Sequence, residues 1–237
     1  MPGDRKTLTY PKRESGMGSK ANRPNFDAIA YDDLVPRLRT GDVVVFHGVS
    51  LASRVIERVT GSRYSHAAMV YRPDPNEPPM LWETGPDPIV EDPRTQSRHG
   101  GAQLGYLDQA LRTMNRPAFG DTPYVRQLEF ERTEEFERMA AQVVRELEGR
   151  PFPSLIQMAG DWLAGQFRFV TTDKRMYCAE LVAATFMRLG LLPFDPPDNF
   201  YDPKDFSIEY DRVPWQRGAR LGPQYQIVGL EARQGHA

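Results

Sequence analysis

Residues 66–84, HAAMVYRPDPNEPPMLWET, decide the fold class of this chain. The apolar runs His66–Tyr71 and Met80–Thr84 have the length and the residue types of buried strands. Pro73–Pro79, between them, is rich in turn residues. A short connection of this kind joins antiparallel neighbours, so the stretch predicts a β-hairpin.

Further strands and helices flank this hairpin without the regular strand–helix alternation of a parallel sheet, and no glycine-rich phosphate loop is present. Strands are predicted at Val43–Phe46, Ile89–Val90, Tyr124–Phe130 and Gln224–Leu230. Helices are predicted at Ser50–Thr60, Tyr106–Met114, Thr133–Leu147, Ser154–Phe167 and Met176–Leu189. Pro193–Pro203 is predicted to be a loop. The order indicates a mixed α+β domain.

Composition excludes several classes of protein. The chain has 237 residues, with 30 Lys+Arg against 32 Asp+Glu and a formal charge of −2, which argues against a dedicated nucleic-acid binder. Its one cysteine can form neither an internal disulfide nor a Cys-pair zinc site. No apolar run approaches the roughly 18 residues of a transmembrane helix, and 40% hydrophobic residues suffice for a core.

The first 25 residues are polar and rich in Gly, Pro, Ser, Lys and Arg, and they lack the apolar core of a signal peptide. We expect residues 1–25 to be a disordered tail and residues 26–237 to form one catalytic domain. A basic arm that contacts an acidic partner or lipid head groups is the alternative for the tail. The default location is cytoplasmic, and export without a cleaved signal stays open.

Three residues have the chemistry of a nucleophilic site: Cys178 at the start of a predicted helix, His66 at the start of a strand, and Glu83 on the next strand. A helix N-terminus and a neighbouring imidazolium both lower the pKa of a thiol. The imidazole in turn needs a third group that fixes its tautomer and ring angle. Strands about 4.8 Å apart allow a carboxylate on one to reach a histidine on the other.

Each of these residues has a commoner structural interpretation when taken alone. A single cysteine in a helix is most often a small buried hydrophobe, and a lone histidine at a strand start is more often structural. Tyr64, Tyr177 and His47 could line the site, and either tyrosine could donate to an oxyanion, although packing tyrosines and loop histidines are commoner.

Four motifs, taken in their order along the chain, favour the catalytic interpretation over the structural one. They are residues 38–46 (LRTGDVVVF), 64–66 (YSH), 82–83 (WE) and 177–182 (YCAELV). Together they resemble the YiiX-type, circularly permuted branch of the NlpC papain-like superfamily. Ala179 stands where that family usually has Ser. The resemblance implies a papain-like fold whose antiparallel sheet packs against helices. It implies Cys178 as nucleophile, His66 as general base and then acid, and Glu83 as the orienting group.

The predicted function is therefore a cysteine-dependent amidase or peptidase that forms a thioester intermediate, without cofactor or metal. Its partner would be a peptide, amide or lipid-ester substrate. A lipid acyl hydrolase or acyltransferase on the same site is one alternative, and a non-catalytic binding module is another. His47, His66 and Glu83 could also form a zinc site, but such a site would leave Cys178 without its base.

Overall fold

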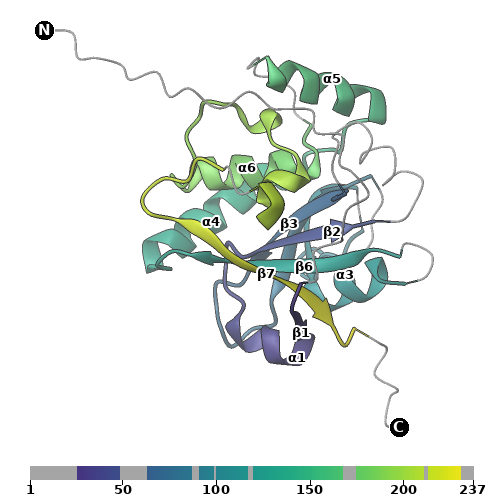
Figure 1. The fold of residues 1–237 in the computed structure, drawn as a ribbon, viewed down its shortest axis with the longest axis vertical. Coiled ribbons are helices and arrows are strands. Elements are labelled where there is room, and N and C mark those ends of the chain that lie inside the picture. The colour runs from purple at the N-terminus through teal and green to yellow at the C-terminus, as the bar shows by residue number, and fades with distance from the viewer. Residues whose placement is uncertain are drawn as a thin grey trace, which may run out of the picture.

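The computed structural model describes residues 26–48, 63–86, 91–98, 100–116, 120–167, 175–210 and 213–230. Its centre is a seven-stranded sheet of order β1-β7-β6-β2-β3-β4-β5 (Figure 1). The strands are β1 Ala28–Ala30, β2 Val43–His47, β3 His66–Tyr71, β4 Met80–Gly85, β5 Gly101–Tyr106, β6 Thr122–Glu129 and β7 Arg220–Val228.

The sheet is mixed. β1 runs parallel to β7, and every other neighbouring pair is antiparallel. The α+β prediction is confirmed, whereas the expectation of a purely antiparallel sheet is wrong at this one edge. β1 and β7 come from opposite ends of the chain, so no short turn between them imposes an antiparallel pairing.

The hairpin of β3 and β4 is confirmed, with Met69 paired to Trp82 and Tyr71 to Met80. β2 lies on the other side of β3, and there Phe46 pairs with His66. Every residue of β4 is buried, as expected of a strand covered on both faces.

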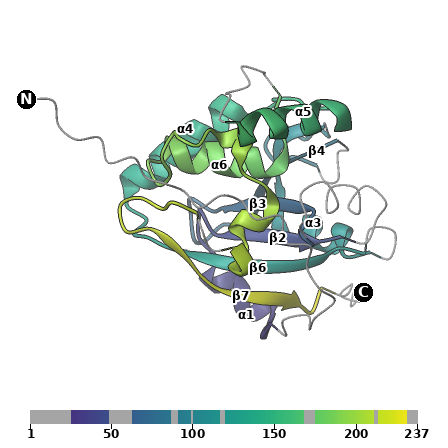
Figure 2. The ribbon, with the colours of Figure 1, turned by 45° about the horizontal axis from the view of Figure 1, so that its top comes forward.

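Helices cover both faces of the sheet. They are α1 Tyr31–Leu34, α3 Leu107–Met114, α4 Glu134–Leu147, α5 Leu155–Gln166 and α6 Cys178–Arg188. Figure 2 shows α4, α5 and α6 above the sheet and α1 below it. The alternation of side chains along the strands divides the core accordingly: Met69 and Trp82 pack with α4 and α6, and Val70 and Leu81 pack with α1 and α3.

Some predicted elements differ from the structure. Residues 101–106, which carry four small or polar residues and no β-branched one, form β5 through pairing with β4. The last strand begins at Arg220, four residues earlier than predicted. The 193–203 loop contains the 3₁₀ turn η2 at Asp198–Phe200, and η1 Val35–Arg37, η3 Pro203–Phe206 and η4 Ile208–Tyr210 are further short turns. The tail 1–25, the helix at 50–60 and the strand at 89–90 lie outside the described residues.

The turn before β2 is held by a buried carboxylate. Asp42 Oδ2 accepts the Arg39 N–H at 3.0 Å, and Oδ1 accepts the Leu128 N–H at 2.9 Å and pairs with Arg132 at 2.9 Å. Burial raises the pKa of Asp42 to about 6, against the lowering effect of these donors. Gly41 precedes it with φ +92°, where an added Cβ would lie 2.8 Å from a Leu128 methyl carbon.

Candidate active site

Cys178 is the first residue of α6 and is almost fully buried, with 5% of its surface exposed. Tyr177, the N-cap, is extended, and its backbone N–H donates to Glu180 Oε2 at 3.1 Å. This contact is one half of a capping box and fixes the first turn of the helix. The thiol therefore lies at the positive end of an eleven-residue helix dipole.

His66 and Glu83 form a pair in which Glu83 is buried and His66 is partly exposed. His66 Nε2 lies 3.0 Å from Glu83 Oε2, and the exposed fractions of the two side chains are 17% and 1%. A carboxylate can only accept, so Nε2 carries the proton of this bond. Glu83 lies two residues beyond Leu81 on β4, and His66 lies four residues before Val70, the partner of Leu81. The alternation of side chains therefore gives both the phase of Val70 and Leu81, and His66, the first residue of β3, also interacts with Cys178 at the start of α6.

The electrostatics of His66 connect it to Cys178 as well. Burial disfavours the protonated ring, but charge and hydrogen-bond interactions with Cys178, followed by those with Glu83, raise the pKa of His66 to about 10. The negative charges of a thiolate on one side and a carboxylate on the other favour the imidazolium form of the ring. The structure thus brings together Cys178, His66 and Glu83.

The two tyrosines point their hydroxyl groups at structural partners. Tyr177 Oη donates to the backbone oxygens of Asn199 at 2.6 Å and Tyr201 at 3.0 Å, so its one proton is shared by the loop after α6. Tyr64 Oη accepts from Gln224 Nε2 at 2.8 Å and lies 3.3 Å from Glu209. These contacts give both residues a packing role next to the site.

His47, the last residue of β2, makes a 2.6 Å contact between its Nδ1 and the backbone oxygen of Arg63. Because a carbonyl only accepts, Nδ1 of His47 is protonated. His47 also acts electrostatically on Asp121, as does His66. These contacts place His47 against the Arg63 backbone and near Asp121.

Asp121 is a titratable residue near His66 that the sequence analysis did not single out. It immediately precedes β6, and its Oδ1 is buried without a hydrogen-bond partner among the described residues. Burial raises the pKa of Asp121 to about 6, while the charges of His66 and His47 act in the lowering direction. In the sequence, Asp121 follows Gly120 in an ordinary turn pattern, and only strand pairing brings it near His66.

Within the described ranges, no three His, Cys, Asp or Glu side chains are arranged to hold a metal ion. The zinc alternative, His47 with His66 and Glu83, thus gains no support from the geometry. His66 Nε2 is already engaged by Glu83, and His47 Nδ1 by a carbonyl.

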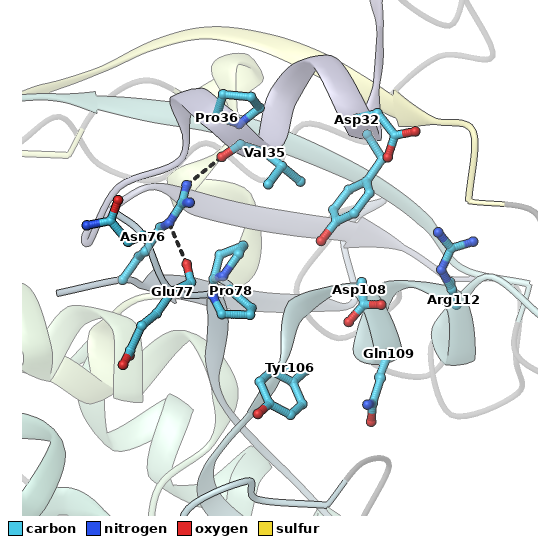
Figure 3. A pocket seen from close by; sticks show the side chains of 13 residues that line it. Asp32, Val35, Pro36, Asn76, Glu77, Pro78, Tyr106, Asp108, Gln109 and Arg112 are labelled. Atoms are coloured by element: carbon cyan, nitrogen blue, oxygen red, sulfur yellow. Dashed lines mark hydrogen bonds between the residues drawn. The ribbon is translucent and has the colours of Figure 1, made fainter. Parts of the chain in front are cut away.

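A cavity of about 910 Å³ lies elsewhere, between α1, the β3–β4 turn and α3 (Figure 3). None of the predicted site residues lines it. Arg72, in its wall, donates to the backbone oxygens of Val35 and Glu77, so this cation holds the surrounding turns together. Tyr31, also in the wall, has its pKa raised by burial and next by the charge of Asp108.

α5 is tied to the start of α6 through η2. Asn199 Nδ2 donates to the Asp161 carbonyl in α5, and the Asn199 carbonyl accepts the Tyr177 hydroxyl. Leu163 and Phe167, one turn apart, are 53% and 69% exposed.

Within the described part of the chain, no helix combines the length and apolar character of a membrane span.

Comparison with known proteins finds similarity among solved structures. No protein-family model matches the chain, and no curated protein matches it. Among solved structures, the chain is similar to the metalloprotein yiiX from Escherichia coli O157:H7, with 21% sequence identity and a TM-score of 0.44. The similarity covers 79% of this chain and 88% of that one.

Proposed function

We propose that this chain is a cysteine-dependent acyl hydrolase of the papain-like type, with an amide or peptide as substrate. The observation that carries the proposal is the 3.0 Å contact between His66 and the buried Glu83, on a histidine whose protonated form Cys178 also stabilises. A thiol at a helix start, a histidine and an orienting carboxylate are the parts that thiol acyl transfer requires.

In the proposed mechanism, the thiol proton of Cys178 passes to Nδ1 of His66, while Nε2 stays bonded to Glu83. The thiolate attacks the substrate carbonyl carbon, and the C=O π pair moves onto oxygen. Collapse of this intermediate re-forms the carbonyl and expels the amine, which takes the proton from His66. Water, deprotonated by His66, then cleaves the thioester, and the thiol leaves with that proton.

The start of α6 suggests the oxyanion donor. The first N–H groups of a helix have no intrahelical acceptor, and that of Cys178 is adjacent to the sulfur. The hydroxyl of Tyr177 is shared by two backbone carbonyls. We therefore assign the oxyanion role to the backbone at Cys178 in preference to Tyr177 or Tyr64.

The test is acyl-enzyme trapping. The full chain is incubated with panels of peptides, amides and lipid esters, quenched with acid, and measured by intact mass. The proposal predicts a mass increase equal to the acyl group in the wild type, none in Cys178→Ala, and an unaltered adduct in Asp108→Asn, a control in the distant cavity. Saturable binding of a panel member without an adduct or product would instead indicate a binding module.

Lipid esters are the second candidate substrate class, and a specific observation favours them. The exposed side chains of Leu163 and Phe167 lie on a helix tied through Asn199 to the residue before Cys178. A Leu163→Ser/Phe167→Ser variant should lose turnover of vesicle-borne esters while keeping that of a soluble thioester. Equal loss on both substrates would count against a lipid role for this surface.

A further inference from the structure

Four titratable residues lie on or next to four neighbouring strands of the sheet. In the strand order β6-β2-β3-β4, Asp121 precedes β6, His47 ends β2, His66 begins β3, and Glu83 is on β4. His66 thus has Glu83 on one side and Asp121 on the other. His47 follows Phe46, the partner of His66, so the alternation of side chains directs His47 to the opposite face of the sheet.

The strand register places Asp121 on the same face of the sheet as His66. Asp121 lies two residues before Pro123, which pairs with Phe46, and Phe46 pairs with His66. The Phe46 ring packs on the His66 ring with centroids 5.4 Å apart. This apolar ring limits the access of water between the charges, so their interaction is screened less than at an open surface.

The partial burial of Asp121 disfavours its charged form, and a nearby cation offsets this cost. Its Oδ1 has no hydrogen-bond partner among the described residues, and a buried carboxylate oxygen in that state is costly. The groups that favour its ionised form are His66 on β3 and His47 on β2. His66 itself faces Cys178 from α6 and Glu83 from β4. Ionised Asp121 and protonated His66 therefore support each other.

We propose that Asp121 is a positioning residue of the candidate site: its carboxylate stabilises the protonated ring of His66 from the side opposite Glu83 and keeps the Cys178–His66 pair charged. This inference rests on the proposed function. The direction of the effect follows from the charges that act on Asp121, which are those of His66 and His47. Loss of its charge then disfavours the charged pair.

The first experiment measures the rate of Cys178 alkylation by iodoacetamide between pH 5 and 9 in wild type, Asp121→Asn and Asp121→Glu. At pH 7 we expect Asp121→Asn to react about two- to tenfold more slowly, as for the loss of one charge several ångströms away. Asp121→Glu should restore the rate. At pH 5, where Asp121 is largely protonated, wild type and Asp121→Asn should converge. Asp108→Asn is the matched control and should follow the wild type throughout.

The second experiment needs no variant. Histidine ¹⁵N NMR of the wild type should show a small inflection of the His66 ring signals near pH 6, as Asp121 ionises. Its absence, or an Asp121→Asn alkylation profile identical to the wild type, would overturn the role of Asp121. Wild-type alkylation like that of an ordinary thiol would overturn the proposed function itself, whatever Asp121 does.

Discussion

At the scale of single residues, His66 is the most informative position. A buried imidazole ordinarily loses its proton, yet here the neighbouring Cys178 and Glu83 raise its pKa to about 10. The sequence predicted which residue types would meet. It could not predict that Glu83 is 99% buried, because Glu on a strand is usually solvated, and its burial follows from cover on both faces of β4.

Glu83→Gln tests the orienting role. The amide keeps the shape of the side chain but removes the charge that favours the imidazolium, so the His66 pKa should fall. We expect kcat/KM to fall tenfold to a thousandfold, less than in Cys178→Ala or His66→Ala, because Glu83 orients and does not react. The measurement combines kinetics with histidine NMR. Unchanged kinetics together with a lowered His66 pKa would leave Glu83 without a catalytic role.

At the scale of elements, the first turn of α6 carries a buried carboxyl group beside the thiol. Burial, and then the charge of Asp198, raise the pKa of Glu180 to about 8, against the hydrogen bond from the Tyr177 N–H. The hydrogen bond from the Tyr177 N–H gives Glu180 a structural role at the start of the helix. The elevated pKa of Glu180 also depends on the charge of Asp198 in η2, and no local sequence pattern predicts this interaction.

The pH dependence of stability tests this assignment. A carboxyl whose pKa is higher in the folded than in the unfolded state binds more protons when folded, so its contribution to stability is lost as pH rises from about 4.5 to about 8. We expect Glu180→Gln to flatten the fall in the free energy of unfolding over this window, an effect on the order of a few kcal/mol. Urea melts at pH 5, 6.5 and 8 measure it.

The control is Glu134→Gln, an exposed residue in the first turn of α4. It should keep the wild-type slope of stability against pH. A slope in Glu180→Gln that matches the wild type would contradict the elevated pKa of Glu180.

At the scale of the whole molecule, one buried arginine joins distant segments of the chain. Arg126 on β6 is 1% exposed, and its guanidinium donates to the carbonyls of Gly222 at 2.8 Å, Leu221 at 2.7 Å and Phe206 at 3.3 Å. These contacts tie β6 to β7 and to η3. The sequence shows Arg126 only as a polar position in an alternating strand.

Arg126→Ala should destabilise the fold by about 3–5 kcal/mol, because it leaves a cavity and unpaired buried carbonyls. Since a domain of this size loses about 2–4 °C per kcal/mol, the melting temperature should fall by roughly 10 °C. Arg126→Lys should recover only part of this loss, as an ammonium lacks the planar fork. Arg220→Ala, whose side chain is 73% exposed, is the control and should melt within about a degree or two of the wild type. An equally small change in Arg126→Ala would contradict the account.

Chelation separates thiol chemistry from the zinc alternative. The proposed mechanism needs both nitrogens of His66 for proton transfer and orientation, so EDTA should leave activity and Cys178 labelling unchanged. Activity lost with EDTA and restored by zinc would refute the thiol mechanism.

The sequence predicts the elements that depend on local interactions, and it does not predict those that depend on pairing between distant segments. The hairpin, α4 and α6 depend on local periodicity and caps, and they were predicted to within a few residues. β1, β5 and the approach of Asp121 to His66 depend on pairing between segments far apart in the chain. Cys178, His66 and Glu83 were found through motif order, whereas Asp121 belongs to no such motif.

The pH profile of Cys178 alkylation tests the central claim most directly. Iodoacetamide modification of the chain's single cysteine is followed by intact mass from pH 4 to 10, for the native protein and for the same protein in urea. A thiolate paired with His66 at the start of α6 predicts that the native rate reaches its plateau below pH 8, while the unfolded chain reacts as a free thiol with a midpoint near 8.5. Native and unfolded profiles that both rise only near pH 8.5 would contradict the account.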